Sequence, residues 1–286
     1  MAKFVLSGFA DEIASDLTSQ INGVKDNGIS FIEMRNVDGK SLIQHSPDQV
    51  KEIKKRLDDN GLRLSAIGSY LGKQSITEPF THLDEFRYTL EIAEIMEVRN
   101  IRMFSFYIPE DSDPADYRSE VMDRWHQFVE AAEGTDIMLL HENEKGIYGD
   151  NAERCLDLVK EMDSPHMKLI FDPANFVQCG VDPYPDAWNM LKDYVVYYHI
   201  KDAVKATGEV RPAGYGDGNI PEMLKAINDD ASIPSDREFF LSLEPHLANF
   251  QGFASLENGA DSLPEGDNVE KYTLARKSLQ KILNEI

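Results

Sequence analysis

Four successive apolar segments of the sequence each carry, near their end, a residue that can bind a metal ion. These residues are Glu142 in MLLHE, Asp172 in LIFD, His199 in VVYYHI and Glu244 in LSLE. Three carboxylates in a partly desolvated pocket repel one another, and a divalent cation removes that conflict. Carboxylates with one imidazole suit Mn²⁺ or Mg²⁺ better than an ion that prefers thiolates. We expect these four residues to bind one divalent metal ion, with manganese favoured over magnesium, cobalt and zinc.

Any one of these residues has a simpler explanation, since a lone acid after a strand is usually a helix cap or a solvated loop residue. Four in succession favour a shared site. Lys201 faces the same side of its strand as His199, because side chains alternate along a strand, so it could bind substrate or form a salt bridge to a strand-end acid. Asn175 could bind substrate or shape a turn, and His246 could belong to the site or lie in a solvated loop. Arg211 completes the predicted substrate contacts.

Other residues carry weaker indications. Glu33 and Arg35 face the same side of their strand, where they could form an internal ion pair, our first choice, or contact a sugar. His141 points away from the side of Glu142 and is interpreted as structural. Five aromatic residues could wall a sugar site, although packing is the favoured role of each: Phe9, Tyr70, Tyr107, Tyr148 and Trp188.

Short apolar segments alternate with longer helical patterns along the chain. The predicted strands are Phe4–Gly8, Phe31–Arg35, Leu62–Gly68, Ile101–Tyr107, Asp136–Glu142, Lys168–Asp172, Val195–Lys201 and Phe239–Glu244. Two helices are indicated by the stripes Leu17, Ile21, Val24 and Val50, Ile53, Leu57, the second opened by Ser46 and Pro47. Further helices are predicted over Leu83–Glu97, Pro114–Glu133, Asn151–Met162, Tyr184–Asp193, Ile220–Asn228 and Val269–Asn284.

Eight strand-then-helix units at similar spacing predict an α/β fold, a single (β/α)8 TIM barrel over residues 1–286. A doubly wound open sheet is the alternative, but no G-x-G-x-x-G follows the first strand. In a parallel barrel the carboxyl ends of all strands open on one mouth, so the four candidate ligands converge there. Leu247–Asn268, rich in Gly, Asn, Ser and Asp, lies in a mouth loop, where it could be a lid or a solvated insertion.

The composition excludes several classes of function. The chain has 29 basic and 51 acidic side chains and a net charge of −22, which disfavours nucleic acid and anionic membranes as partners. No apolar run approaches the ~18 residues of a membrane span, and the N-terminus does not resemble a signal peptide. With only Cys155 and Cys179, reduced thiols and a cytoplasmic location are expected.

The run YYHIKD followed by GYGDG resembles the xylose isomerase-like barrel superfamily of sugar isomerases and epimerases, and HEN, FDPAN and LEPH match its other metal-bearing segments in order. The resemblance implies that Glu142, Asp172, His199 and Glu244 bind one divalent ion. It also implies that the two glutamates serve as acid and base. Asn175 stands where ketose 3-epimerases of this group commonly have His. The H-I-K-D form looks more like the inosose dehydratase and unassigned sugar-phosphate isomerase branches.

We therefore expect a metal-dependent isomerase or epimerase that acts on a sugar or sugar phosphate through an enediolate. Glu142 and Glu244 would transfer the proton. The alternatives are an inosose dehydratase-like lyase, a non-catalytic sugar-binding barrel, and an endonuclease IV-like phosphodiesterase. The last is disfavoured by the charge and by only 7 histidines. The expected partner is a small-molecule polyol or sugar, with no nucleic acid, no membrane and a possible homo-oligomer.

Overall fold

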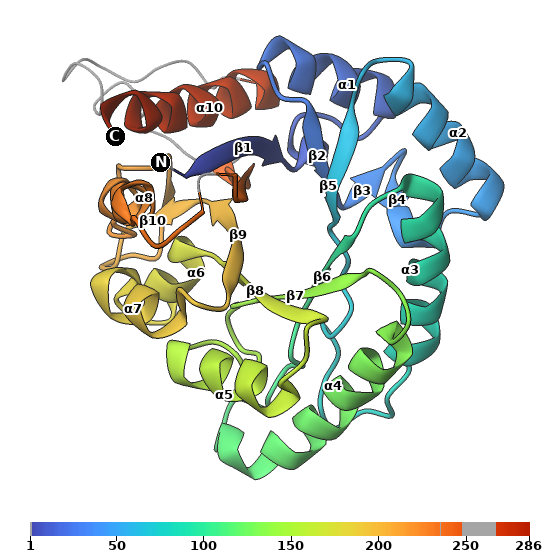
Figure 1. The fold of residues 1–286 in the computed structure, drawn as a ribbon, viewed down its shortest axis with the longest axis vertical. Coiled ribbons are helices and arrows are strands. Elements are labelled where there is room, and N and C mark those ends of the chain that lie inside the picture. The colour runs from blue at the N-terminus through green and yellow to red at the C-terminus, as the bar shows by residue number, and fades with distance from the viewer. Residues whose placement is uncertain (1, 235, 248–266) are drawn as a thin grey trace.

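The computed structural model describes residues 2–234, 236–247 and 267–286. Its main sheet has eight strands in the order β1-β12-β9-β8-β7-β6-β5-β2, and every neighbouring pair is parallel. β1 and β2, at the two ends of this order, lie next to each other, so the barrel is nearly closed (Figure 1). The strands are β1 (Lys3–Gly8), β2 (Phe31–Met34), β5 (Arg63–Ile67), β6 (Asn100–Met103), β7 (Met138–Glu142), β8 (Met167–Phe171), β9 (Val195–Ile200) and β12 (Glu238–Leu243).

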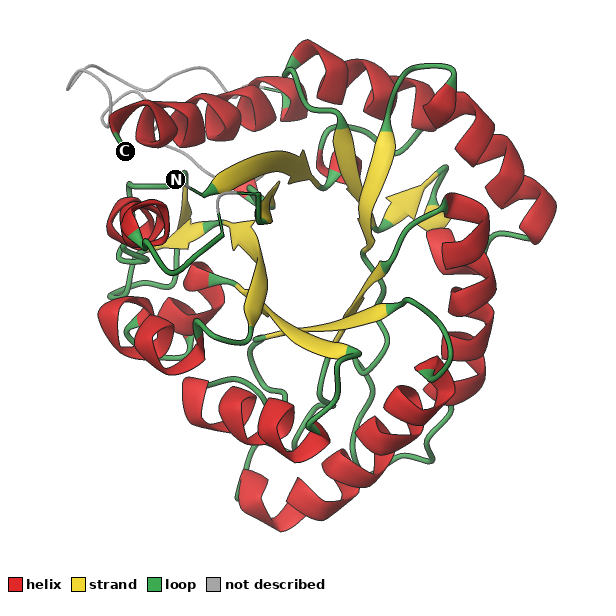
Figure 2. Cartoon of the chain, viewed as in Figure 1, coloured by secondary structure: helices red, strands yellow, loops and turns green. Residues whose placement is uncertain are grey.

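Helices follow the strands and form the outer ring of the barrel (Figure 2). They are α1 (Leu17–Asp26), α2 (Pro47–Asp58), α3 (His82–Met96), α4 (Arg118–Ala132), α5 (Ala152–Met162), α6 (Pro173–Gln178), α7 (Trp188–Leu191), α8 (Ile220–Asp229) and α10 (Asn268–Glu285). This arrangement confirms the predicted TIM barrel. None of the described helices is both long enough and apolar enough to cross a membrane.

The start of α2 shows how the local sequence sets an element. The Ser46 hydroxyl accepts from the Gln49 amide N–H, and the Gln49 side chain accepts from the Ser46 amide, which is a reciprocal capping box. Pro47 occupies the first turn, where a missing N–H costs nothing. Val50, Ile53 and Leu57 form the buried stripe against the barrel, as the spacing predicts.

The barrel interior is layered, and the layers fix where the polar strand ends lie. Ala66, Leu140, Ile170 and Tyr197 form a small apolar cluster, separate from the large core between strands and helices. Two residues further along three of these strands the chain reaches residues 142, 172 and 199. Because side chains alternate across a strand, these residues face the same interior one layer nearer the mouth. The apolar layer therefore forms the floor of the candidate site.

The structure differs from the predicted elements in several places, and the short helix α6 was not predicted. The strand predicted over Ile101–Tyr107 ends at Met103, and Phe106 has a left-handed φ of 67° that no strand contains. The helix predicted over Tyr184–Asp193 is reduced to Trp188–Leu191, because Tyr184 is extended between two prolines. Two short hairpins were not predicted, β3–β4 (Asn36–Val37, Lys40–Ser41) and β10–β11 (Asp202–Ala203, Val210–Arg211). The predicted lid segment Leu247–Asn268 lies mostly outside the described residues.

Gly72 offers a test of packing in the loop after β5. It has a φ of 89°, and a Cβ there would overlap the backbone carbonyl of Phe104. Gly134 has a similar φ of 79° with no atom within 4 Å of an added Cβ. Both Ala variants carry the left-handed strain, but only Gly72→Ala adds overpacking. We expect Gly72→Ala to lower the free energy of unfolding by about 1–3 kcal/mol more than Gly134→Ala in urea titrations. Equal losses of unfolding free energy in the two variants would contradict the close contact between Gly72 and Phe104.

Candidate metal centre

The four predicted ligands converge at the carboxyl ends of their strands. Glu142 ends β7, Asp172 follows β8, His199 lies in β9, and Glu244 follows β12. One ligand atom from each lies within 4.8 Å of all the others. All four side chains are buried, with at most 4% of any side chain exposed. Four buried groups of this kind at one point could hold a metal ion.

His199 is oriented by carboxylates on both of its ring nitrogens. Nδ1 lies 3.0 Å from Oε1 of Glu142, 3.5 Å from Oε2 of Glu244 and 3.8 Å from Oδ2 of Asp172. Nε2 lies 3.1 Å from Oε2 of Glu33. Burial opposes the charged imidazole, but Glu142 and Glu33 raise the pKa of His199 well above its usual value. A cation on Nδ1 would supply the positive charge that this surrounding favours, while Nε2–H donates to Glu33.

Asp172 presents a buried oxygen that suits a cation. It caps α6, since its Oδ1 accepts from the amide of Asn175 at 2.9 Å. Nζ of Lys201 lies 3.0 Å from its Oδ2, yet this oxygen receives no hydrogen bond from the described residues. Burial raises the pKa of Asp172 to about 7. A metal ion bound to this oxygen would stabilise the ionised form of the buried carboxylate. The residues present therefore fit a divalent ion.

Two buried cations neutralise the remaining carboxylates. Nζ of Lys201 lies 2.9 Å from Oε2 of Glu244, and Nη1 of Arg102 lies 3.2 Å from Oε2 of Glu142. Burial alone would raise the pKa of Glu142, but His199 and Arg102 outweigh it and lower that pKa to about 2. Burial is likewise outweighed at Glu244, where Lys201 and His199 hold the pKa well below its usual value. Both glutamates are therefore carboxylates, as bases and ligands must be.

Glu33 and Arg35 reach the site but have different partners from the predicted ones. Glu33 contacts His199, as above, and is fully buried. Arg35 donates from Nε to Oδ2 of Asp11 at 2.8 Å and from Nη1 to Oε1 of Glu244 at 3.2 Å. The ion pair predicted between Glu33 and Arg35 is therefore not formed. Glu33 instead contacts His199 of β9, and Arg35 contacts Glu244 after β12. The Phe9 ring lies edge-on to His199 with centroids 5.2 Å apart, which makes Phe9 one apolar wall of the site.

The structure places the predicted substrate-contacting residues at different depths. Asn175 is buried and donates to Oε1 of Glu142 at 3.3 Å and to the carbonyl of Asn143 at 2.9 Å, so it holds a candidate ligand. Arg211 lies on β11 and donates to Glu209 at 2.7 Å. The three glycines of the GYGDG run, Gly214, Gly216 and Gly218, fold around Asp202, whose carboxylate accepts the amide N–H of each.

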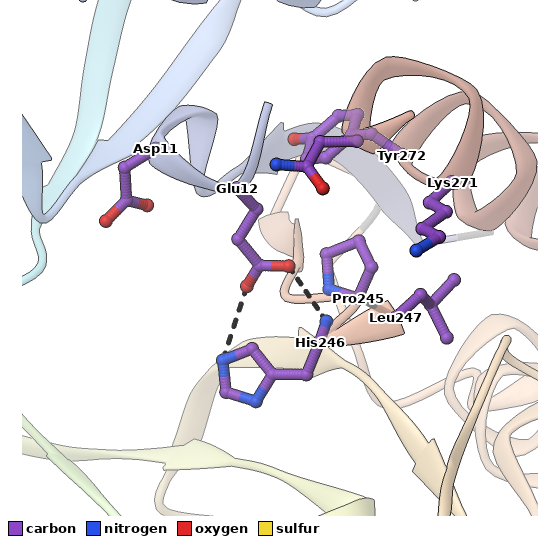
Figure 3. Close-up of a pocket in the computed structure, with 8 residues that line it drawn as sticks. Asp11, Glu12, Pro245, His246, Leu247, Lys271 and Tyr272 are labelled. Carbon is purple, nitrogen blue, oxygen red and sulfur yellow. Dashed lines mark hydrogen bonds and ion pairs between the residues drawn. The ribbon is translucent and has the colours of Figure 1, made fainter. Parts of the chain in front are cut away.

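His246 lies at the edge of the cluster. Its Nε2 is 3.4 Å from Oε1 of Glu244 and 3.3 Å from Oε1 of Glu12, and 42% of its side chain is exposed. Its left-handed φ of 47° is supported by Glu12, which accepts from the His246 amide at 2.8 Å (Figure 3). Burial and the charge of Glu244 raise the pKa of Glu12 to about 8. Glu12 therefore acts as a hydrogen-bond acceptor, and as a donor when it is protonated.

Sequence reasoning missed Arg102, Glu12 and Asn143. Arg102 is the one charged residue in the strand NIRM, and a lone charge in a buried strand is a signal that could have found it. Glu12 follows the first strand, as the predicted ligands follow theirs. Asn143 brackets the Asp172 backbone, with its amide donating to the carbonyl and its oxygen accepting from the N–H, both at 2.9 Å. His141, in contrast, is buried against Trp125 as predicted, and burial lowers the pKa of His141 to about 3.

The contact between Glu33 and His199 predicts a measurable role. We expect Glu33→Gln to weaken divalent-metal affinity by ~10–100-fold, because the partner of a ligating imidazole fixes its tautomer and raises its basicity. Isothermal titration with Mn²⁺ measures this change. Glu238→Gln is the control, since Glu238 starts a barrel strand at the opposite end and pairs with Lys3 at the surface. Unchanged metal affinity in Glu33→Gln would show that Glu33 does not contribute to metal binding.

Sequence comparison finds relatives that are enzymes. A 3-dehydroshikimate dehydratase of Bacillus anthracis is 22% identical over 229 residues, which cover 77% of this chain and 81% of that protein. A 2-epi-5-epi-valiolone 7-phosphate 2-epimerase of Actinoplanes is 26% identical over 192 residues, 66% of this chain and 68% of that one.

Solved structures share the fold. A xylose isomerase-like TIM barrel protein from Mycobacterium smegmatis, in complex with magnesium, superposes with a TM-score of 0.66 at 16% identity and covers 99% of this chain and 98% of that one. The family model described as "Xylose isomerase-like TIM barrel" matches residues 21–234. The chain belongs to the xylose isomerase-like TIM barrel family.

Proposed function

We propose that the protein is a divalent-metal-dependent isomerase or epimerase of a sugar or sugar phosphate. The observation that carries this proposal is the buried convergence of Glu142, Asp172, His199 and Glu244 at the barrel mouth. The two relatives named above are enzymes, one an epimerase and one a dehydratase. Manganese is the favoured ion because three of the four ligands are carboxylates, and magnesium is the next candidate because a protein of this fold binds it.

The chain's residues suggest how the reaction would run. A divalent ion at this centre, when bound, supplies polarisation of a substrate carbonyl and stabilisation of negative charge. Glu142 or Glu244 removes a proton from the carbon next to that carbonyl, and the same or the other glutamate returns it. The two glutamates come from β7 and β12, which β8 and β9 separate, so they approach the centre from different sides. This placement suits proton transfer on two faces of a planar intermediate.

The buried cations Lys201 and Arg102 keep Glu244 and Glu142 ionised, as a base must be. Lys201 lies within 3.0 Å of both Asp172 and Glu244, and Arg102 lies 3.2 Å from Glu142. An opposite charge at such distances favours the ionised carboxylate. Arg102 and Lys201 would also contact the substrate oxygen on which negative charge develops.

A dehydratase is the second candidate, and one relative carries that activity. It begins with the same proton abstraction, and a β-hydroxyl group then leaves as water. Lys201 is the residue nearest to Glu244 that could protonate the leaving hydroxyl. The products decide between the two reactions. Manganese-loaded protein is incubated with free ketoses, ketose phosphates and inososes, and the products are identified by NMR after the metal has been removed. An epimer or isomer supports the proposal, whereas an unsaturated product with released water supports the dehydratase.

A further inference from the structure

The side-chain amide of Asn143 joins the two strand ends that carry the candidate ligands Glu142 and Asp172. Backbone pairing between β7 and β8 ends at Glu142 and Ile170. Beyond that point Nδ2 of Asn143 donates to the carbonyl of Asp172, and Oδ1 of Asn143 accepts from the Asp172 amide, both at 2.9 Å. Asn143 is 1% exposed, and both ends of its amide are hydrogen-bonded within the protein. This side chain therefore replaces a backbone contact between strands and fixes the backbone of Asp172 relative to Glu142.

Asn175 holds the carboxylates of the same two ligands. Its backbone N–H donates to Oδ1 of Asp172 at 2.9 Å. The other oxygen of Asp172, Oδ2, receives no hydrogen bond from the described residues and lies 3.8 Å from Nδ1 of His199. The Asn175 side chain donates to Oε1 of Glu142 at 3.3 Å and to the carbonyl of Asn143 at 2.9 Å. The hydrogen bonds of Asn143 and Asn175, together called the asparagine clamp, thus form one closed circuit through both ligands.

Glu244, by contrast, is held by contacts that allow more movement. Its amide donates to the Ile200 carbonyl at 3.4 Å, which is longer than the usual N–H···O distance of about 2.7–3.2 Å. Its carboxylate lies 2.9 Å from Nζ of Lys201 and 3.2 Å from Nη1 of Arg35. Side chains of this length have several rotatable bonds and can follow a carboxylate that moves. The spacing of the ligand pair from β7 and β8 is therefore more firmly set than the position of Glu244.

The rigidity of a carboxylate pair influences which ions it can hold. Mg²⁺ requires oxygen ligands at about 2.0–2.1 Å in near-ideal octahedral geometry, whereas Ca²⁺ takes more oxygens at about 2.3–2.6 Å in flexible sites. Selectivity between such ions depends on the size of the site, the number of ligands and their freedom to move. Two carboxylates that cannot move apart favour the smaller ion, because the larger ion needs longer bonds to its ligands.

We infer that the asparagine clamp sets the size of the ion that the centre accepts, and that it favours the smaller ions Mg²⁺ and Mn²⁺ over Ca²⁺. Asn143 and Asn175 are positioning residues, because they act through the carboxylates that they hold and do not ligate the ion themselves. The hydrogen bonds of Asn175 support this role rather than the substrate contact predicted from the sequence. This inference rests on the proposed function and adds to it the residues that select the metal.

The ratio of two ion affinities tests the clamp. Binding of Mn²⁺ to the metal-free protein is measured from the electron paramagnetic resonance signal of free Mn²⁺, and Mg²⁺ and Ca²⁺ affinities are measured by displacement of Mn²⁺. We expect Asn143→Ala and Asn175→Ala each to lower Mg²⁺ affinity ~10–100-fold, as loss of a ligand's hydrogen-bond partner typically does. Ca²⁺ affinity should fall much less, so that the Mg²⁺-to-Ca²⁺ ratio decreases ~10-fold or more. His199 is present in every variant, so its own preference among ions cancels from the comparison.

Asn100→Ala is the matched control. The Asn100 side chain also donates to a neighbouring strand, to the Ser65 carbonyl at 2.8 Å, but it starts β6 at the opposite end of the barrel. The Mg²⁺-to-Ca²⁺ ratio of this variant should equal that of the unmodified protein. A decrease as large as in the clamp variants would assign the effect to general loosening of the barrel and contradict the inference. Equal losses of both affinities in Asn175→Ala, or no loss, would overturn the inference and leave the metal centre intact.

Two further measurements keep the test decisive. If Asn143→Ala does not fold, Asn175→Ala decides alone, because there Asp172 retains both of its bonds to Asn143. The double variant should lower the ratio by less than the product of the two single effects, since opening the circuit at one place already frees the ligands. A decrease equal to that product would show that the asparagines act separately and would contradict the clamp. Failure of Mn²⁺ to bind the unmodified protein would instead contradict the proposed metal-dependent function itself.

Discussion

Replacing either Glu142 or Glu244 by glutamine is expected to lower turnover by more than the ~10²–10⁴ typical of an acid–base group alone. Glutamine keeps the shape and one ligating oxygen, but it has no basic carboxylate. Metal ligation is weakened as well, so two contributions are lost together. The variants should stay folded, because glutamine is nearly isosteric with glutamate. Turnover is measured at saturating Mn²⁺, with Glu238→Gln as a folded control at the opposite end of the barrel.

The isotope pattern distinguishes two uses of these glutamates. If they act on opposite faces of the substrate, one variant exchanges hydrogen with D₂O from one epimer only and forms no product. If a single glutamate does all the proton transfer, exchange is lost for both epimers in one variant and retained for both in the other. Near wild-type turnover in either variant, fully loaded with metal, would show that its carboxylate is not the base.

Removing the metal is expected to abolish activity completely, and Mn²⁺ is expected to restore it. Purified protein should contain about one divalent ion per chain, because the four ligand atoms converge on one point. Asp172→Asn and His199→Ala should lower metal occupancy far more than Lys201→Met. Lys201 lies beside the centre as a cation and cannot ligate a metal while protonated. Metal content by mass spectrometry after dialysis measures these differences.

The comparison with Lys201 makes this prediction specific. All three side chains are buried at the same place, so a general loss of packing would affect the variants alike. Full activity after exhaustive chelation, with no metal detected, would refute the metal centre. A loss of metal in Lys201→Met equal to that in His199→Ala would show that the assigned ligand set is incorrect.

The barrel and its four candidate ligands could be predicted because each depends on local sequence. Period-two alternation within a strand sets which face a residue occupies, so residues 140 and 142, or 197 and 199, share the barrel interior. Parallel strands then bring their carboxyl ends to one mouth. The capped start of α2 is equally local, since Ser46, Pro47 and Gln49 are close in sequence. Such features need no knowledge of how distant strands meet.

Contacts across the barrel interior could not be predicted in this way. Glu33 on β2 meets His199 on β9, and these strands lie far apart in the sheet order. Arg35 meets Glu244, 209 residues away in sequence, although a pair with Glu33 was expected. Such partners depend on barrel closure and on the lengths of the side chains. The residue pattern of a single strand gives no information about how the barrel closes or how far a side chain reaches across it.

Short or interrupted elements could not be predicted from the sequence for a different reason. The β3–β4 and β10–β11 hairpins have two residues per strand, which is too short for any periodicity to be recognised. Tyr184 lies between Pro183 and Pro185 and is extended, although the residues that follow have helical spacing. Arg102 could not be predicted from the apolar pattern of its strand, because a charged side chain interrupts that pattern without indicating its partner.

The most direct test of the account is deuterium incorporation at the carbon next to the substrate carbonyl. The protein is prepared metal-free and Mn²⁺-loaded, and each form is incubated in D₂O with the ketoses, ketose phosphates and inososes named above. Mass spectrometry of the recovered sugars then measures deuterium per molecule. We expect incorporation by the loaded protein and none by the metal-free protein or by the doubly substituted Glu142→Gln, Glu244→Gln variant. Product formation without deuterium, or equal incorporation in the presence and absence of metal, would contradict it.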